Sequence, residues 1–362
     1  MFYREAGQFK TSYGADQALF PVRQDLIGVL AIVALAFIAV PLFASNFFLN
    51  AIMIPFLVFA LAAVGLNILT GYAGQLSLGT GAFMGVGAYA CYKLTTFFPD
   101  VNILVHVMFS GVFAALVGVF FGLPSLRIKG LYLAITTLAA QFFLEWCFNR
   151  IGWLYNYNDS GAIEVPGRTL FGVQITGAMA SPVTRYCVIL VIVTVLSVIA
   201  VNVLRGRIGR SWMMIRDMDI AAELMGINPL QAKLSAFAFS SYYCGVAGAL
   251  MVFFWLGSAE VEAFDINHSF LILFMVIVGG MGSIAGSFLG AAFIWVLPVI
   301  IRAVPEFLGI DMVAATTEHI TNIITGVLII FFLIVEPHGL ARLWQIGREK
   351  LRSWPFPYAQ DG

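Results

Sequence analysis

The sequence predicts an all-α fold, a polytopic transmembrane helical bundle of about ten spans with glycine-rich interrupted helices. Of the 362 residues, 61% are hydrophobic and 10% are charged, whereas a soluble domain is about 45–50% apolar and about 25% charged. The apolar residues gather in runs close to the roughly 20 residues that a helix needs to cross a bilayer. Two of these runs are bordered by segments rich in glycine, and there we expect breaks in the helices.

Ten apolar runs are candidates for the spans. They cover residues 26–43, 51–70, 78–94, 102–123, 130–148, 186–204, 234–256, 269–278, 284–302 and 319–335. The first run begins too late and is too long for a cleavable signal, so we expect it to remain a span. The run at 269–278 is too short to cross a bilayer, and we expect a half-helix there that ends at a break near the midplane.

The basic residues predict that both termini are cytoplasmic, because cytoplasmic loops carry the excess of Lys and Arg. With the N-terminus inside, the inner side receives Arg4, Lys10, Arg23, Arg127, Lys129, Arg205, Arg207, Arg210, Arg216, Lys233, Arg342, Arg348, Lys350 and Arg352. The outer side receives Lys93, Arg150, Arg168, Arg185 and Arg302. The outer loops collect acids, which either solvate them or form a docking face for an extracytoplasmic partner: Asp100, Asp159, Glu164, Glu260, Glu262, Asp265, Glu306, Asp311 and Glu318.

Several classes of function are disfavoured by what the sequence holds. The 19 basic and 19 acidic residues balance, which favours neither nucleic acid nor an acidic partner. Cys91, Cys147, Cys187 and Cys244 lie within or beside apolar runs without a CxxC pair, so we expect small hydrophobic side chains rather than metal ligands. The sequence contains no HExxH, GxSxG or P-loop pattern, so it predicts no catalytic residue, no metal and no cofactor.

The first glycine-rich segment spans residues 71–87 and has six glycines in seventeen residues. On a helix, Ser77, Gly81 and Gly85 would form a smooth seam for a neighbouring helix. Alternatively, Gly71 and Gly74 would unwind the chain within the membrane, so that freed polar groups line a pathway. The polar residues closest to this break are Gln75, Ser77 and Thr80.

A second segment, residues 279–292, repeats the pattern. Gly282, Gly286 and Gly290 again recur every four residues, and Gly279, Gly280 and Ser283 mark the break. Paired interruptions in the two halves of a chain point to a transport site. Close helix packing alone is the alternative interpretation for each residue, including the hydroxyl and amide groups.

The third informative segment, residues 216–229, predicts a short helix, a sharp turn and a second helix at the inner membrane surface. Asp217 or Asp219 is expected to cap the first helix. Gly226 suits the position just after its end, and Asn228 followed by Pro229 begins the next helix.

Here a family resemblance is apparent. The Ala221-Ala222-Glu223 run with Gly226 after a basic stretch resembles the loop by which ABC-importer permeases contact their ATPase. Together with residues 71–79, 126–138, 279–283 and 336–340 it resembles the LivM-type permease family of branched-chain amino acid ABC transporters. The resemblance covers about residues 26–342. Residues 155–162 depart from the glycine-rich, Asn-containing turn that such permeases often show, which leaves the exact substrate open.

The resemblance implies a multi-pass subunit of the bacterial inner membrane, surrounded by membrane lipid. It implies a second, LivH-like permease, two cytoplasmic ATP-binding subunits and a periplasmic binding protein as partners. Asp219, Ala221, Ala222, Glu223 and Gly226 would sit in the ATPase-coupling loop. The implied organisation is a cytoplasmic segment at 1–25, a permease domain at 26–340 with the coupling loop at 205–233, and a cytoplasmic tail at 341–362.

Two alternatives stay open at the level of sequence. A permease of the same family could carry another small polar solute, such as urea or a small carboxylate. A stand-alone secondary carrier or channel would need ionisable residues inside the membrane. Only Glu145 lies clearly within a span, close to its outer end beside Trp146, which fits a carboxylate at the interface better than a proton relay. An energy source on another chain is therefore the favoured interpretation.

Overall fold

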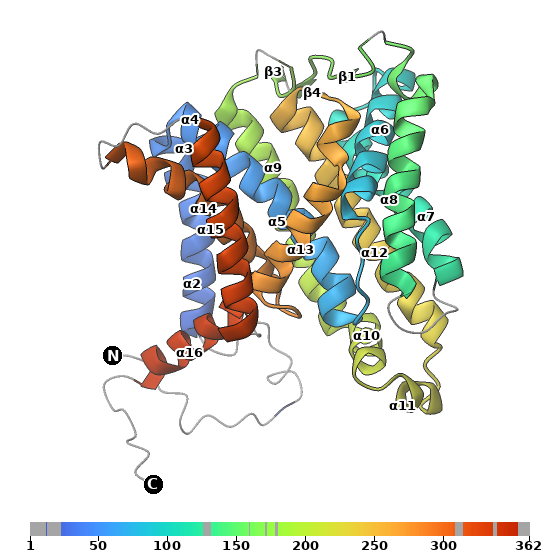
Figure 1. Cartoon of the computed structure of the whole chain (residues 1–362), viewed down its shortest axis with the longest axis vertical. Helices are drawn as coiled ribbons and strands as arrows, with labels where there is room; N and C mark the ends of the chain where they lie inside the picture. Colours follow the sequence, from blue (N-terminus) through green and yellow to red (C-terminus); the bar gives the residue numbers. More distant parts are fainter. Residues whose placement is uncertain are drawn as a thin grey trace.

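A computed structural model shows one bundle of helices with two small pairs of strands at one end (Figure 1). It describes residues 12, 23–125, 132–158, 160–170, 172–177, 180–307, 314–335 and 339–353. Several predicted features lie outside the described residues: Arg4, Lys10, Arg127, Lys129, Asp159, Asp311, residues 126–131 and 336–338 of the family motifs, and most of the segments 1–25 and 354–362.

Within the described residues, each of the ten predicted spans overlaps a helix. In chain order the helices are α2 (Arg23–Ala34), α3 (Val40–Phe43), α4 (Asn46–Phe48), α5 (Ile54–Asn67), α6 (Thr80–Phe97), α7 (Ile103–Ser125), α8 (Tyr132–Arg150), α9 (Pro182–Arg205), α10 (Arg207–Asp217), α11 (Asp219–Leu224), α12 (Pro229–Leu250), α13 (Ile266–Gly279), α14 (Ile284–Phe307), α15 (Ala314–Val335) and α16 (Gly339–Ser353). Short π-helical turns join α2 to α3 and α4 to α5, and extend α5 and α12.

Seven helical stretches among the described residues are long and apolar enough to cross a membrane. They are Leu26–Phe43, Asn46–Tyr72, Ile103–Leu123, Pro182–Arg205, Pro229–Leu256, Val261–Gly279 and Ile284–Ile301. The other three predicted ranges correspond to α6, α8 and α15, which have 18, 19 and 22 residues. The chain is therefore an all-α, multi-pass membrane protein.

The helix predicted at 269–278 begins earlier than its apolar run, at Ile266, and it ends at the predicted break after Gly279. With the turn before it, α13 belongs to a 19-residue stretch, Val261–Gly279, long enough to cross a bilayer. The start of α13 was left out of the predicted run because Asn267 and His268 are polar. The first turn of α13 begins at Asp265, whose carboxylate accepts a hydrogen bond from the backbone N–H of His268 at 3.2 Å.

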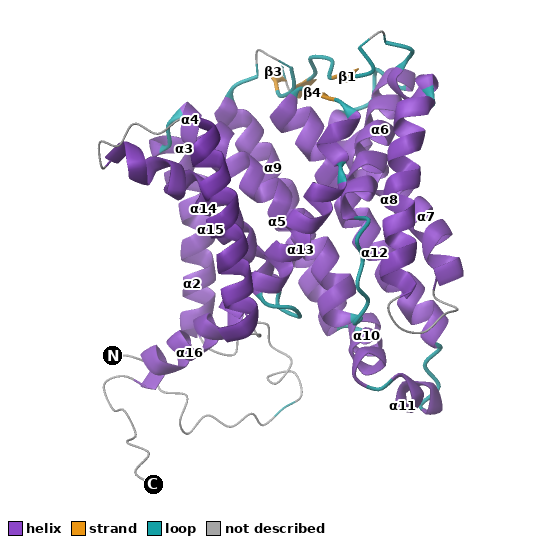
Figure 2. Ribbon diagram, in the orientation of Figure 1, coloured by secondary structure: helices purple, strands orange, loops and turns teal. Residues whose placement is uncertain are grey.

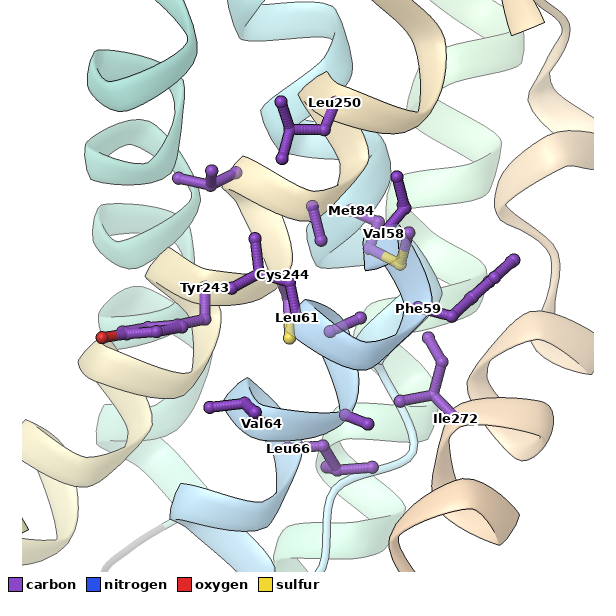
Figure 3. Packing of buried hydrophobic residues seen from close by; sticks show 14 of the residues in the cluster. Val58, Phe59, Leu61, Val64, Leu66, Met84, Tyr243, Cys244, Leu250 and Ile272 are labelled. Atoms are coloured by element: carbon purple, nitrogen blue, oxygen red, sulfur yellow. The ribbon is translucent and has the colours of Figure 1, made fainter. Parts of the chain in front are cut away.

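Helix α5 forms the centre of the bundle. All its residues except Phe56 are buried, as expected for a helix that is apolar on every side. Figure 3 shows Val58, Leu61 and Val64 of α5 between α12, which contributes Tyr243 and Leu250, and α13. Because α5 contacts helices from both halves of the chain, its C-terminal end lies against segments that are distant in sequence.

Glycine lets pairs of helices touch through their backbones. A Cβ added at Gly87 of α6 would lie 2.0 Å from the carbonyl oxygen of Gly245 in α12, and one at Gly248 would lie 1.9 Å from that of Met84. Between α13 and α14, a Cβ at Gly279 would lie 2.1 Å from the oxygen of Gly286. Helices in lipid have no hydrophobic driving force for association. Small residues at such crossings allow the close packing that holds the helices together instead.

Both predicted glycine seams need a correction. Gly81 and Gly85 lie in α6 and pack closely against Phe264 and its neighbours, and Gly286 and Gly290 lie in α14 and pack against α13. The first member of each series is outside the helix, because α6 begins only at Thr80 and α14 only at Ile284. Ser77 is in an extended segment, and Gly282 is in a turn at a φ of +80°.

The described residues between α8 and α9 form a small cap at the strand-bearing end of the bundle. The strand β1 (Ile163–Glu164) pairs with β4 (Ser258–Ala259), and β2 (Thr169–Leu170) pairs with β3 (Val173–Gln174), both antiparallel. Arg168 donates to the carbonyl oxygens of Pro99 and Thr95, the latter at 2.9 Å. Lys93 bonds to Asn156 and lies 4.2 Å from the Trp153 ring centre. The cap is thus fastened to α6.

Candidate substrate pathway and coupling helix

The first glycine-rich break is an extended segment inside the bundle. After the π-helical turn Ile68–Tyr72 the chain is non-helical until α6 begins at Thr80. Figure 2 shows this segment as a loop that rises from the level of α10 to the start of α6. The contacts agree, because Gly74 packs on Arg216 of α10 and Gly79 packs on Thr137 of α8. Of the two interpretations of this segment, unwinding therefore holds for residues 73–79 and close packing for Gly81 and Gly85.

Side chains from other helices satisfy the backbone at the start of α6. Backbone N–H groups exposed by an interrupted helix are costly in the membrane unless they are paired. Thr137 Oγ1 accepts from Leu78 N at 2.9 Å, Ser269 Oγ from Gly81 N at 2.8 Å, and Gln141 Oε1 from Ala82 N at 2.7 Å. Gln141 also donates to the carbonyl oxygen of Phe264 at 2.7 Å. These bonds fix the break in one place between α8 and α13.

Two of the predicted pathway residues are buried without a partner. Gln75 is 7% exposed and Thr80 is 1% exposed. Neither the amide of Gln75 nor the hydroxyl of Thr80 has a hydrogen-bond partner within the described part of the chain. Ser77 differs, because its hydroxyl accepts from Gly79 N at 3.4 Å. An unsatisfied buried polar group costs about 1–3 kcal/mol, so Gln75 and Thr80 need an explanation beyond packing.

The second break, Gly280–Ser283, meets the first one through Asn67. The Asn67 amide donates to the carbonyl oxygen of Ser283 and to the Ser287 hydroxyl, both at 2.8 Å. Its Oδ1 accepts from Gly282 N at 2.8 Å. A Cβ at Gly71 would lie 2.2 Å from Gly282 N. The structure thus brings together Gly71, Gly279, Gly280 and Ser283, while Gln75 and Thr80 lie further along the extended segment.

The C-terminal family motif reaches the same place. A Cβ at Gly339, the first residue of α16, would lie 2.6 Å from Gly280 N and 2.7 Å from the carbonyl oxygen of Val278. Three segments that resemble family motifs in the sequence therefore converge on one turn.

The predicted coupling loop forms a short helix at the end of the bundle opposite the strands (Figure 1). It is α11, Asp219–Leu224, and it ends in a double hydrogen-bonded turn in which Ile227 N donates to Ala222 O and Gly226 N to Glu223 O. Gly226 has a φ of +84°, which favours glycine at this position. Asn228 caps α12 by accepting from Leu230 N and Gln231 N, as predicted.

The predicted cap at the start of α11 is wrong. The residue that precedes the helix is Met218, and no side chain caps it. Asp219 is the first helical residue, and a carboxylate at this position interacts favourably with the positive end of the helix dipole. Asp217 instead pairs with Arg216, with 2.8 Å between Nε and Oδ1.

Helix α11 presents apolar side chains to its surroundings. Ala222 is buried against the bundle, and Ala221 and Glu223 are exposed. Ile220 is 66% exposed and Leu224 is 85% exposed, and Met218 and Met225 beside the helix are also exposed. Neighbouring exposed apolar side chains of this kind are typical of an interaction surface.

The residues that connect the two breaks, α8 and α10 were not predicted from the sequence. Asn67, Gln141 and Arg216 each bond to a segment far along the chain. A signal existed for the first two, because each is a lone amide inside an apolar run and a buried amide needs partners. No pattern singled out Arg216 from the neighbouring arginines.

Comparisons with known proteins agree with this architecture. The model of a family described as the permease component of the branched-chain amino acid transport system matches residues 48–333. Two relatives, from Escherichia coli K12 and Salmonella typhimurium LT2, are each named "High-affinity branched-chain amino acid transport system permease protein LivM". Each is 29% identical over 311 residues, which cover 78% of this chain and 68% of the relative. No solved structure matches. The chain therefore belongs to the LivM-type family of branched-chain amino acid ABC-transporter permeases.

Proposed function

We propose that this chain is one permease subunit of a binding-protein-dependent ABC importer that carries branched-chain or related small amino acids across the bacterial inner membrane. The observation that carries the proposal is the family match over residues 48–333 together with the exposed helix α11 at one end of the bundle. ATP hydrolysis belongs to two cytoplasmic subunits, and the pathway is shared with a second, LivH-like permease. A periplasmic binding protein delivers the substrate.

The proposed topology puts both termini in the cytoplasm and uses ten spans. In it, residues 1–25 and 341–362 are cytoplasmic, 26–340 form the permease domain, and 205–233 contain the coupling loop. The basic residues of α10 support this orientation, because Arg207, Arg210 and Arg216 lie next to α11. Asp219, Ala221, Ala222, Glu223 and Gly226 form or shape the ATPase contact, in which Ile220 and Leu224 add the apolar area.

The proposed pathway follows the two breaks. Gln75 and Thr80 contact the substrate, because each lies at the first break and is a buried polar group without a partner in the described residues. Ser77, Gly71, Gly74, Gly279, Gly280 and Ser283 shape the pathway. A small amino acid has a carboxylate that accepts hydrogen bonds and an ammonium that donates them, and an amide such as that of Gln75 serves either group. ATP binding moves α11, and the breaks change conformation in response, which gives alternating access.

Uptake by proteoliposomes that contain the complex purified with this chain tests the proposal. We expect labelled leucine to accumulate when ATP is present. This accumulation should continue after a protonophore has collapsed the proton gradient. Gln75→Leu should raise the KM for uptake about tenfold, equivalent to one lost hydrogen bond of roughly 1.4 kcal/mol. Ser197→Ala, which removes a buried hydroxyl from α9, serves as the control and should leave KM unchanged.

The outcomes separate the two parts of the proposal. Accumulation that follows the proton gradient instead of ATP would identify a secondary carrier. ATP-driven accumulation of urea or a small carboxylate in place of leucine would support another substrate of the same family. An unchanged KM in Gln75→Leu would remove this side chain from the pathway while leaving the transporter assignment intact.

A further inference from the structure

Arg216, in the last turn of α10, bonds to the first glycine-rich break and lies beside the second. Its Nη1 donates to the carbonyl oxygen of Gly71 at 2.7 Å. A Cβ built at Gly74 would lie 2.8 Å from Arg216 Cγ, so the aliphatic part of the side chain packs on that glycine. A Cβ built at Gly282, in the second break, would lie 3.6 Å from the same Nη1. One side chain thus bridges segments about 140 and 66 residues away in sequence.

The helix that carries Arg216 is firmly attached to the bundle on one side and to α11 on the other. Trp212 is fully buried, and its Nε1 donates to Ser235 Oγ of α12 at 2.9 Å. Met218 alone separates α10 from α11. The backbone N–H of Met218 still bonds to Met214 in α10, and Ala222 N bonds to Met218 O. Backbone hydrogen bonds through Met218 thus connect α11 to the end of α10, where Arg216 lies.

Asn67 joins the two breaks. It lies just before the turn that holds Gly71, and it bonds to both Gly282 and Ser283 of the second break. The surroundings of Arg216 also constrain its position, since Asp217 Oδ1 lies 2.8 Å from its Nε and orients the guanidinium. The exposed ion pair itself contributes little to stability, so its effect is on geometry.

We propose that Arg216 is the positioning residue that passes movement of the coupling helix α11 to the two glycine-rich breaks. The bond from Arg216 to Gly71 O holds the start of the extended segment against α10. When α11 is displaced, this bond pulls on or releases Gly71, and Asn67 transfers the change to the turn at Gly282. Arg216 does not contact substrate or nucleotide in this account. The inference deepens the proposed function and rests on it.

The test compares transport with ATP hydrolysis in the same proteoliposomes. Arg216→Met keeps the aliphatic packing on Gly74 but removes the donor to Gly71 O. We expect the purified complex to retain its subunits and to hydrolyse ATP within about twofold of the parent, while leucine transported per ATP falls at least about tenfold, as expected for one lost charge-assisted hydrogen bond. Arg216→Lys, which keeps a charged donor, should recover part of the ratio. Arg210→Met, in the same helix, should keep the parent ratio.

The inference is overturned if Arg216→Met transports as much leucine per ATP hydrolysed as the parent does. If that variant fails to assemble, leucine transport per ATP is measured in Arg216→Gln instead, because the glutamine amide is too short to replace the guanidinium at Gly71. A merely structural role would lower transport and hydrolysis together and also overturn the inference. Absence of ATP-driven uptake in the parent would instead refute the proposed function, so the two failures are distinguishable.

Discussion

Replacing Gly290 by leucine is expected to prevent the protein from accumulating in folded form. A Cβ at this position would lie 1.8 Å from the carbonyl oxygen of Met275 and 2.8 Å from the backbone N and Cα of Gly279. These are backbone atoms of α13, so no side-chain rotation relieves the clash. Overpacking of a well-packed core costs about 1–3 kcal/mol, and here two helices must separate, so we expect a loss at or above the upper end.

The measurement is the fraction of protein that remains monodisperse in detergent after heating, compared with the parent. Gly28→Ala is the control, because a Cβ at Gly28 of α2 would have no atom of the described residues within 4 Å apart from its own turn of the helix. This control should change the unfolding free energy by less than about 0.5 kcal/mol. Parent-like stability of Gly290→Leu would show that α13 and α14 do not cross as closely as described.

Replacing Asn67 by leucine is expected to produce the second largest loss, about 3 kcal/mol of unfolding free energy. Leucine has a similar volume but makes no hydrogen bonds. The N–H of Gly282 loses its acceptor, and Ser283 O and the Ser287 hydroxyl lose a donor. Asn67 is 1% exposed, so water does not replace the lost bonds without rearrangement of the turn.

Ser287→Ala provides the comparison for this change, because it removes one partner and leaves the bonds from Asn67 to Gly282 and Ser283. We expect about 1 kcal/mol of destabilisation, measured by the midpoint of thermal unfolding in the same detergent. An equal loss in Ser287→Ala and Asn67→Leu would mean that the two breaks are not joined by the amide of Asn67.

The helices were predictable from the sequence because the bilayer imposes a simple rule on each of them. A span must be long and apolar, and runs such as 186–204 and 284–302 satisfy it without reference to other parts of the chain. The rule misplaces helix ends that are polar. It placed the start of α13 too late, since Asp265, Asn267 and His268 lie in its first turn or just before it.

The candidate site was predictable only in part. The glycine breaks could be recognised, since six glycines in seventeen residues are costly in an isolated helix. The polar partners of the breaks could not be paired in advance, because they come from helices far apart in the chain. Asn67 and Gly282 are separated by 215 residues, and Arg216 and Gly71 by 145. Such pairings depend on how the helices are arranged, which local patterns do not encode.

The coupling segment, residues 216–229, was predictable in its local features but not in its long-range contacts. Its helix, its terminal glycine and the Asn228 cap are local features and were predicted. The direction of Arg216 toward Gly71 depends on the packing of Trp212 against α12, which the local pattern does not reveal.

Purification of the tagged protein from its native membrane in mild detergent tests whether this chain is a permease driven by ATPases that dock on α11. We expect ATP-binding subunits and a second permease to copurify with the parent. Glu223→Lys and Gly226→Pro should lose the ATP-binding subunits and keep the second permease. Glu260→Lys is the same charge reversal directly after β4, which lies at the opposite end of the bundle (Figure 1), and it should retain both. Absence of ATP-binding subunits from the parent, or their retention in both α11 variants, would contradict the account.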